Sequence, residues 1–413
     1  MRIALLSYRS KRHVGGQGVY VERLSKALAD RGHHVEVFSG QPYPALDPRV
    51  TLTEVPSLDL YREPDPFRTP RLREFRDWID VLEVATMWTA GFPEPLTFSL
   101  RAARELRARR GEFDVVHDNQ CLGFGLLAVA RSSPMVATIH HPISRDRTLD
   151  LKAARWWRKP MVHRWYGFVR MQGFVARRLP RVLTVSSSSA ADIADAFGVH
   201  DDAITVAPLG VDTDVFRPSD APRVPGRIVA VASADVVLKG VRHLLESVAK
   251  LRTERDVELQ LVSKCDPDGP TRRLIDQLDL GDVVHISSGL EDAELAALLA
   301  SAEIACVPSL YEGFSLPTVE AMSCGTPLVV SRAGAIPEVV GADGLCADLV
   351  PPGDTEALTA TLAALLDDPQ RRAALGARGR SRAEERYSWA AVAAATEAVY
   401  DSARTRARRE RNS

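Results

Sequence analysis

Short apolar runs alternate with stretches of helical periodicity along this chain, and the alternation starts twice. Strands of a parallel sheet are buried on both faces, so they appear in a sequence as continuous apolar runs. In the first half these runs are Ile3–Ser7, His34–Ser39, Val115–Asp118, Met135–His140, Val182–Ser186 and Ile204–Ala207. In the second half they are Ile228–Ser233, Glu258–Ser263, Val283–Ile286, Ile304–Val307 and Pro327–Val330. The pattern predicts an α/β chain of two Rossmann-like, doubly wound units.

A proline-rich segment separates the two halves. Residues 217–226 (RPSDAPRVPG) lack an apolar pattern, which is typical of a linker. Ligands of doubly wound sheets bind beyond the carboxyl ends of the strands. Two such units facing a central cleft would therefore place a ligand site between them.

Charge and cysteine content narrow the classes of partner. A net charge of −1 over 413 residues disfavours nucleic acid as a partner, because such binding needs a dominant basic surface. The five cysteines are odd in number and none are paired at metal-ligand spacing, which indicates reduced thiols in a cytoplasmic protein. No window approaches 18 uninterrupted apolar residues. Any membrane contact is therefore expected to be peripheral, at the inner face of the membrane.

The segment YEGFSLPTVEAMSC, residues 311–324, carries the most specific pattern in the chain. Glu312 and Glu320 are eight positions apart, and Pro317 suits the first turn of a helix that carries Glu320. The N–H groups of residues 314–316 would then lie free at the start of this helix, where anions and polar oxygens bind. We interpret the two carboxylates as ligands for two sets of hydroxyls on one molecule; a solvated helix with two surface glutamates is the alternative.

A lysine follows the first strand of the second half. Lys239 and Gly240 lie between the strand Ile228–Ser233 and a predicted helix. A lysine in this place can direct a point charge at an anionic group of a ligand. A surface lysine near a helix start remains the alternative.

Candidate residues in the first half lie at strand ends and in a glycine loop. His140 ends one strand, and Asp118 and Asn119 end another, where they could reach a ligand, which the resemblance described below would make the acceptor. Gly15 and Gly16 allow the backbone to approach a phosphate or an acceptor closely. A dinucleotide-binding fingerprint fits poorly, because Val21 stands where its third glycine would be.

A basic, aromatic segment spans residues 152–181, and no Asp or Glu occurs between Leu151 and Ala191. Its basic residues are Lys152, Arg155, Arg158, Lys159, Arg164, Arg170, Arg177, Arg178 and Arg181, interleaved with Trp156, Trp157, Trp165, Tyr166, Phe168 and Phe174. Three interpretations stay open: contact with an anionic membrane surface, a pocket for an acidic or phosphorylated acceptor, and a helix pair with core aromatics and solvated arginines.

Taken together and in order, these segments resemble the retaining glycosyltransferases of the GT-B fold, in particular glycosyltransferase family 4. The segments that carry the resemblance are Gly15-Gly16, Pro208–Asp212, Glu312–Glu320, Ser323–Val329, Gly334–Glu338 and Tyr387–Trp389. The resemblance implies an N-terminal acceptor-side domain at 1–213, onto which a C-terminal helix at 388–404 packs back. It implies a nucleotide-sugar-binding domain at 214–387.

The resemblance also implies the reaction and the residue roles. A sugar would pass with retention from a nucleotide sugar to an acceptor, lipid-linked or a small metabolite, without a metal or other cofactor. The implied catalytic residues are His140, Glu312 and Lys239. Glu320 would hold the ribose and Glu312 the sugar hydroxyls. The implied donor-binding residues are Gly15, Gly16, Lys239, Lys264, Glu312, Gly313, Phe314, Ser315, Leu316 and Glu320.

One position departs from the family pattern. Ala234 stands where the family has an arginine, about five residues before the lysine, so one of two charges that neutralise the diphosphate is missing. Lys264, just past the strand Glu258–Ser263, is the candidate substitute. The departure keeps open a non-catalytic relative that binds a nucleotide sugar or glycan. A nucleotide-sugar epimerase on the same fold is a second alternative.

Overall fold

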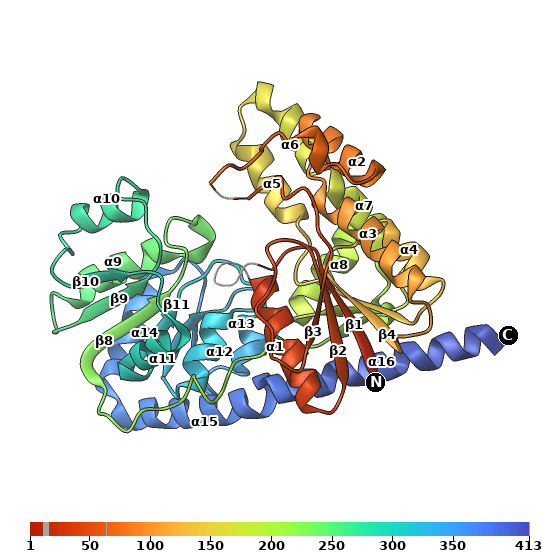
Figure 1. Ribbon diagram of the computed structural model, residues 1–413. Coiled ribbons are helices and arrows are strands. Elements are labelled where there is room, and N and C mark those ends of the chain that lie inside the picture. The colour runs from red at the N-terminus through yellow and green to blue at the C-terminus, as the bar shows by residue number, and fades with distance from the viewer. Residues whose placement is uncertain (11–15, 63, 413) are drawn as a thin grey trace. The chain divides into compact units, whose positions relative to one another are not determined.

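The computed structural model describes residues 1–10, 16–62 and 64–412, and Figure 1 shows their two α/β units. By their internal contacts, unit 1 comprises Met1–Ala207 with Val392–Ser413, and unit 2 comprises Pro208–Ala391. The boundaries expected from the sequence are 213/214 and 387/388.

Unit 1 is built on a parallel sheet in the strand order β3-β2-β1-β4-β5-β6-β7. The strands are β1 (Arg2–Ser7), β2 (His34–Ser39), β3 (Thr51–Glu54), β4 (Val115–Asn119), β5 (Met135–Thr138), β6 (Val182–Thr184) and β7 (Ile204–Val206). The helices are α1 (Gly16–Asp30), α2 (Trp78–Trp88), α3 (Glu94–Ala108), α4 (Gly125–Ala130), α5 (Ser144–Ala153), α6 (Lys159–Trp165), α7 (Gly167–Ala176) and α8 (Ser187–Phe197). Short 3-10 turns lie at Leu72–Glu74, Trp156–Arg158 and Asp201–Ala203. The order confirms the Rossmann-like prediction, because β1 pairs in parallel with both β2 and β4 and the strand order across the sheet reverses there.

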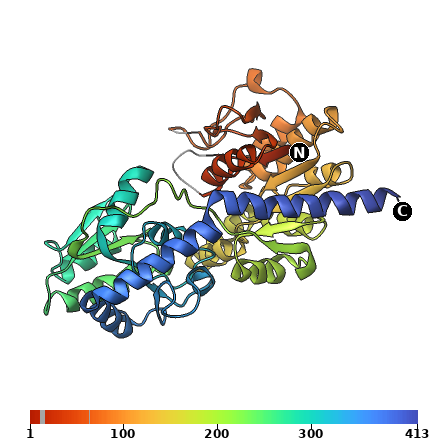
Figure 2. The same ribbon diagram turned by 90° about the horizontal axis from the view of Figure 1, so that it is seen from below.

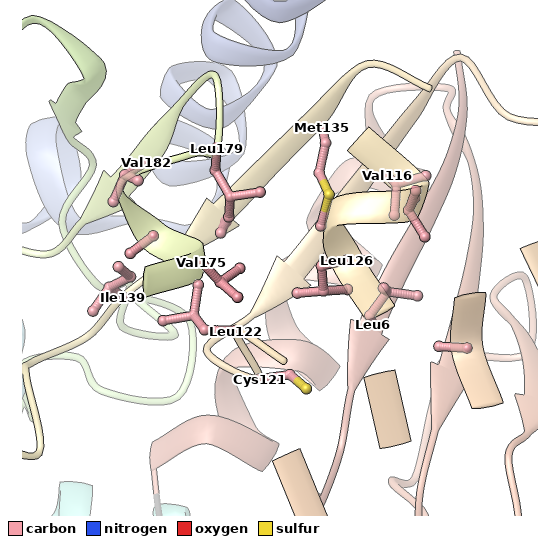
Figure 3. Packing of buried hydrophobic residues seen from close by; sticks show 14 of the residues in the cluster. Leu6, Val116, Cys121, Leu122, Leu126, Met135, Ile139, Val175, Leu179 and Val182 are labelled. Carbon is pink, nitrogen blue, oxygen red and sulfur yellow. The ribbon is translucent and has the colours of Figure 1, made fainter. Parts of the chain in front are cut away.

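The apolar runs of the sequence form the core of unit 1. Figure 3 shows side chains from β1, β4, β5 and α7 packed together, among them Leu6, Val116, Met135 and Val175. Each of these four is at most 1% exposed. Strand β5 ends at Thr138, two residues earlier than the sequence predicts, so His140 lies in the turn beyond it.

Unit 2 repeats the plan with the strand order β10-β9-β8-β11-β12-β13, again all parallel. The strands are β8 (Val224–Val231), β9 (Glu258–Val262), β10 (Val284–Ser287), β11 (Ala302–Val307), β12 (Leu328–Ser331) and β13 (Asp348–Val350). The helices are α9 (Val241–Leu251), α10 (Pro270–Gln277), α11 (Asp292–Ser301), α12 (Leu316–Ser323), α13 (Ile336–Val340), α14 (Thr355–Asp367) and α15 (Pro369–Tyr387), with a 3-10 turn η4 at Val237–Lys239.

The proline-rich segment 217–226 is not a free linker. Strand β8 already begins at Val224. The Arg223 guanidinium donates to the backbone oxygens of Ala302 at 2.6 Å and Gly325 at 2.8 Å. These bonds hold the segment on unit 2, which the sequence pattern did not reveal because each acceptor is a backbone atom far along the chain.

Two long helices end the chain, α15 and α16 (Trp389–Asn412), and Figure 2 shows them in blue. They are separated at Ser388, and the Val211 N–H donates to the Tyr387 oxygen at 2.7 Å beside this break. In unit 1, Tyr400 of α16 is fully buried, and its hydroxyl lies 2.7 Å from Nδ1 of His117 in β4. The C-terminal part of α16 thus belongs to the packing of unit 1.

Candidate active site

Two loops at the carboxyl edge of the sheet in unit 2 bring Lys239 to Glu312. Lys239 ends η4, which follows β8, and Glu312 lies between β11 and α12. Lys239 Nζ donates to Glu312 Oε1 at 2.8 Å, and Ser309 Oγ donates to the same oxygen at 2.7 Å. Glu312 is only 8% exposed. The carboxylate is therefore fixed in direction by two donors before any ligand binds.

The backbone fixes how closely the two loops approach each other. The Leu310 N–H donates to the Leu238 oxygen at 2.8 Å. Gly240 has φ +64°, and a Cβ atom there would lie 2.0 Å from the Pro308 oxygen. Only glycine fits such a contact, so Gly240 is what allows the lysine loop to lie against the glutamate loop.

A second glycine holds Glu312 from the other side. A Cβ atom on Gly334 would lie 2.1 Å from the Glu312 backbone oxygen, and the Ala335 N–H donates to that oxygen at 2.9 Å. Ser309, Gly334 and Ala335 are contacts that the sequence analysis did not assign to Glu312. The Gly334–Glu338 resemblance was a signal that could have found two of them.

Helix α12 starts where the sequence predicts. Ser315 precedes the helix at φ +88°, and its hydroxyl forms a 2.7 Å hydrogen bond with the hydroxyl of Thr318. The first helical bond runs from the Val319 N–H to the Ser315 oxygen at 3.4 Å. N–H groups of the first helical turn precede that bond and can bind an anion. Phe314 is buried with its ring edge-on to Tyr387, which anchors the start of the helix.

Glu320 lies one turn into α12 in a different environment. The residue is partly accessible, yet its carboxyl is largely surrounded by protein, and this burial raises its pKa to about 7. The charge of Asp292 adds to the effect. The free protein therefore disfavours the charge on this side chain, whereas hydroxyl donors from a ligand would favour it.

A buried alanine stands at the position of the missing arginine. Ala234 is 8% exposed and belongs to the core of unit 2, and its N–H donates to Ser263 Oγ at 2.9 Å. Lys264 follows Ser263 and is exposed at the carboxyl end of β9. In the part of the chain that the structure describes, no hydrogen bond or ion pair joins Lys264 to Lys239 or Glu312.

In unit 1 the predicted strand-end residues separate onto two faces of the sheet. His140 Nε2 donates to Asn119 Oδ1 at 2.8 Å, and Asn119 Nδ2 donates to the Gln17 oxygen at 3.3 Å. Burial lowers the pKa of His140 to about 3, with smaller contributions from His141 and His117. His140 is therefore a neutral hydrogen-bonding group at physiological pH.

Asp118 points to the opposite face, as neighbours in a strand must. Its Oδ2 accepts the Leu122 N–H at 3.0 Å, and burial raises its pKa to about 7. The structure therefore does not bring Asp118 together with Asn119. Gly16 begins α1, and Gly15 lies outside the described residues.

The basic, aromatic segment divides into two parts. Trp156, Trp157 and Met161 are 78%, 54% and 57% exposed. Trp165 and Phe168 instead pack against Phe92, each with ring centroids 5.3 Å apart. The described residues include no helix long and apolar enough to cross a membrane, and among them no His, Cys, Asp or Glu side chains are grouped as a metal site.

Comparison with known proteins assigns a protein family to each of the two units. The family model "Glycosyl transferases group 1" matches residues 213–382, and "Glycosyltransferase Family 4" matches residues 14–215. The chain is 66% identical to an MMP alpha-(1->4)-mannosyltransferase of Mycolicibacterium hassiacum, over 98% of both chains. It is 28% identical to D-inositol 3-phosphate glycosyltransferase 2 of Catenulispora acidiphila, over 97% of this chain and 94% of that one. In structure it is similar to HepE of Anabaena in complex with UDP, with a TM-score of 0.68 and 17% identity over 97% of this chain and 100% of that one.

Proposed function

The chain belongs to glycosyltransferase family 4 and has the GT-B fold, and we propose that the enzyme is an α-(1→4)-mannosyltransferase. It transfers a sugar from a nucleotide sugar to an acceptor, so the epimerase and non-catalytic alternatives fall away. The identity of the sugar and of the linkage rests on the mannosyltransferase relative at 66% identity. At this similarity over nearly the whole length, we expect the same sugar and the same bond.

The observation that carries the donor site is the Lys239–Glu312 contact at the carboxyl edge of the sheet. In the donor complex, we propose, Lys239 turns its charge to the diphosphate and Glu312 accepts the hydroxyls of the sugar. The diphosphate gains charge as the glycosidic bond breaks, so a cation there stabilises the transition state more than the ground state. Glu320 would hold the ribose hydroxyls.

The remaining donor contacts follow from the backbone. N–H groups of the segment from Gly313 to Leu316, including Phe314 and Ser315, would support the sugar or the diphosphate. Lys264 would supply the second cation that Ala234 does not. With two lysines assigned to the diphosphate, the proposal requires no metal ion and no other cofactor.

On the acceptor side we assign His140 and Asn119 to the reacting sugar. The neutral imidazole is a hydrogen-bonding group rather than a base that becomes charged, because its pKa lies far below neutrality. A protein nucleophile is not part of the proposal. The leaving phosphate would take the proton of the acceptor hydroxyl on the same face of the sugar, so that the anomeric configuration is retained.

The test uses purified enzyme without added metal. Thermal shifts with GDP-, UDP- and ADP-linked mannose and glucose would identify the donor, because a ligand of the native state raises the unfolding temperature. NMR of the product formed from α-linked donor and an α-(1→4)-linked mannose oligomer would show the new bond. A new α-(1→4) mannosyl linkage is expected. A β linkage would refute retention, and a different transferred sugar would refute the assignment to mannose.

We also propose that the exposed part of the basic segment contacts an anionic membrane surface. Trp156, Trp157 and Met161 are exposed beside Arg155, Arg158 and Lys159, and no acidic residue lies within 152–181. Co-sedimentation with phosphatidylglycerol vesicles but not with phosphatidylcholine vesicles would support this contact. Unchanged co-sedimentation after Trp156→Ser and Trp157→Ser would refute it.

A further inference from the structure

Unit 1 contains a group of polar side chains that the donor site does not use. Arg9 follows β1, Tyr61 follows β3, Glu94 begins α3, and Asp118 lies near the end of β4. Arg9 Nη2 donates to Glu94 Oε1 at 2.8 Å, and the Arg9 guanidinium lies 5.7 Å from the centre of the Tyr61 ring. We call these four residues the acceptor cluster. None but Asp118 was singled out from the sequence.

Asp118 is linked to Arg9 and Glu94 through Tyr8 and through the loop after β4, without a direct contact among the described residues. Burial raises the pKa of the Tyr8 hydroxyl, and the charges of Glu94 and Asp118 raise it further while that of Arg9 lowers it. The Cys121 thiol, in the loop after β4, also donates to the Pro95 oxygen at 2.9 Å. The loop that follows Asp118 is thus tied to the start of α3, where Glu94 lies.

Each member of the acceptor cluster has a buried polar atom without a hydrogen-bond partner among the described residues. These atoms are Arg9 Nε, Tyr61 Oη, Glu94 Oε2 and Asp118 Oδ1. Buried polar atoms in folded proteins nearly always have partners, so four orphans in one neighbourhood point to a ligand. The set combines a pure donor, carboxyl oxygens and a hydroxyl that can do both. Sugar hydroxyls, which donate and accept, can satisfy all of them.

An aromatic cluster adjoins these polar atoms. The Tyr61 ring lies 5.3 Å from Phe67, 5.5 Å from Phe92 and 6.0 Å from Trp165, measured between centroids. Phe67 is 58% exposed and has φ +66°, a conformation that a bulky residue adopts only when its surroundings impose it. A partly exposed aromatic surface beside a few directed polar groups is the usual composition of a small-molecule site.

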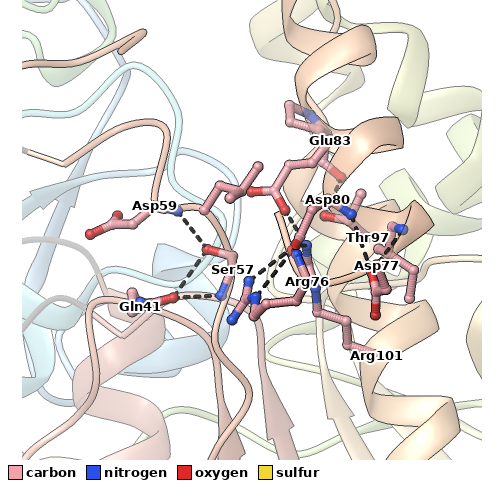
Figure 4. Close-up of polar contacts among 12 residues, drawn as sticks. Gln41, Ser57, Asp59, Arg76, Asp77, Asp80, Glu83, Thr97 and Arg101 are labelled. Carbon is pink, nitrogen blue, oxygen red and sulfur yellow. Dashed lines mark hydrogen bonds and ion pairs between the residues drawn. The ribbon is translucent and has the colours of Figure 1, made fainter. Parts of the chain in front are cut away.

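A polar network beneath holds the segment that carries Tyr61. Gln41 Oε1 accepts the Ser57 N–H at 2.7 Å, and Ser57 Oγ accepts the Asp59 N–H at 3.0 Å (Figure 4). In the same network Arg101 donates to Asp80 at 2.6 Å and to Glu83. The acceptor cluster is therefore supported by fixed groups, as a binding site requires.

We propose that the acceptor cluster and the aromatic rings beside it bind a neutral sugar residue of the acceptor. The sugar ring would lie against Tyr61, Phe67 and Trp165, and its hydroxyls would bond with Arg9, Glu94 and Asp118. The proposal rests on the proposed function in that it names the acceptor of that reaction as an uncharged glycan.

The charges of the cluster argue for a neutral ligand over a phosphorylated one. Arg9 is already paired with Glu94. Burial raises the pKa of Glu94 to about 8 even though the charge of Arg9 lowers it, with Glu83 and Asp59 adding to the rise, and burial raises that of Asp118 to about 7. Surroundings in which burial outweighs a neighbouring cation disfavour any further anion, including a phosphate.

The experiment measures the transfer of mannose to α-(1→4)-linked mannose oligomers at saturating donor. Tyr61→Phe removes only the orphan hydroxyl. If that hydroxyl binds the acceptor, the KM for the oligomer rises roughly three- to tenfold, while the thermal shift with nucleotide stays at the wild-type value. If the hydroxyl has no ligand, the variant keeps its acceptor KM and its stability does not fall. Glu94→Gln and Phe67→Ala should raise the same KM.

Glu36→Gln is the matched control. It alters another partly buried ion pair of unit 1, in which Arg109 Nη2 donates to Glu36 Oε2 at 2.9 Å, and its acceptor KM should equal that of the wild type. Calorimetric titration of the oligomer onto the enzyme–nucleotide complex separates the two proposals. If Tyr61→Phe and Glu94→Gln transfer mannose with the wild-type KM for the oligomer, the acceptor cluster does not bind the acceptor, and the proposed reaction stands. If oligomer binding depends on these residues but no mannose is transferred, the proposed reaction is wrong and the binding site stands. Absence of oligomer binding, or preferred binding of D-inositol 3-phosphate, overturns the neutral-glycan site.

Discussion

Replacing Glu320 by glutamine should stabilise the free enzyme at alkaline pH while it removes nucleotide binding. The folded protein holds the Glu320 proton up to about pH 7, whereas the ordinary value for the unfolded chain is 4.5. Between these values the folded state binds more protons than the unfolded state. The free energy of unfolding therefore falls as pH rises through this window, and the full cost is present above pH 7. Glutamine carries no charge and bears no such cost.

The size of the effect follows from the two pKa values. A difference of about 2.5 corresponds to roughly 3 kcal/mol at about 1.4 kcal/mol per unit. Because the residue is partly accessible, solvent screening reduces this figure, and we expect about 1–3 kcal/mol at pH 8. Near pH 4.5 the difference should be less than about 0.5 kcal/mol. For a unit of this size, the shift at pH 8 corresponds to roughly 3–10 °C in unfolding temperature.

The assay is calorimetry of wild type and Glu320→Gln across this pH range, with and without nucleotide. The difference between the two proteins isolates Glu320 from other groups that titrate in the same window. Asp292→Asn is a graded control. It keeps the carboxyl group of Glu320 but removes the charge that helps to raise the pKa of Glu320, so the stability of this variant at pH 8 should fall between those of wild type and Glu320→Gln. A stability difference independent of pH, or a variant less stable than wild type at pH 8, would refute the reasoning.

Three further predictions concern the loops and the packing around the two sites. Lys239→Met should lower kcat on the order of 10²–10³-fold, because of the two lysines assigned to the departing diphosphate only Lys264 then remains; steady-state kinetics with a near-normal kcat would contradict this. Gly240→Ala should cost about 1–3 kcal/mol by denaturant titration, because the methyl group would meet a backbone oxygen at 2.0 Å and φ is +64°. Gly281→Ala, where nothing lies within 4 Å, should stay near wild type, and equal losses at both glycines would exclude the steric explanation. Arg101→Met leaves the buried Glu83 without its cation and Asp80 with Arg76 alone, and it should destabilise unit 1 by about 3–5 kcal/mol, a loss that thermal unfolding would detect and that a wild-type midpoint would disprove.

Features set by short stretches of sequence could be predicted well. Continuous apolar runs located the strands other than β3 and β13, which the sequence pattern missed, and the alternation with helices predicted both Rossmann-like units. The approach of Lys239 to Glu312 was accessible for the same reason: each residue follows a central strand of one sheet, and the carboxyl ends of parallel strands meet at one edge. The exact strand ends were predicted less well. At the end of β5, for example, the buried apolar run continues to Ile139 although strand pairing stops at Thr138.

The acceptor cluster could not be predicted in this way, because its residues lie in separate segments and are joined only by tertiary packing. Helix α2 shows the difficulty. Its acidic residues Asp80 and Glu83 are each 1% exposed, whereas Trp78 and Trp88 are 62% and 68% exposed. The amphipathic pattern alone would place the opposite face of this helix inside, because it does not show that Arg101 on α3 pairs with both carboxylates and that Arg76 also pairs with Asp80. Local rules fail where a buried cation replaces an apolar contact, and such reversals are most expected beside functional sites. In this protein, helix α2 supports the segment that carries Tyr61. The residues that sequence patterns predict least well therefore lie within and beside the cluster to which we assign the choice of acceptor.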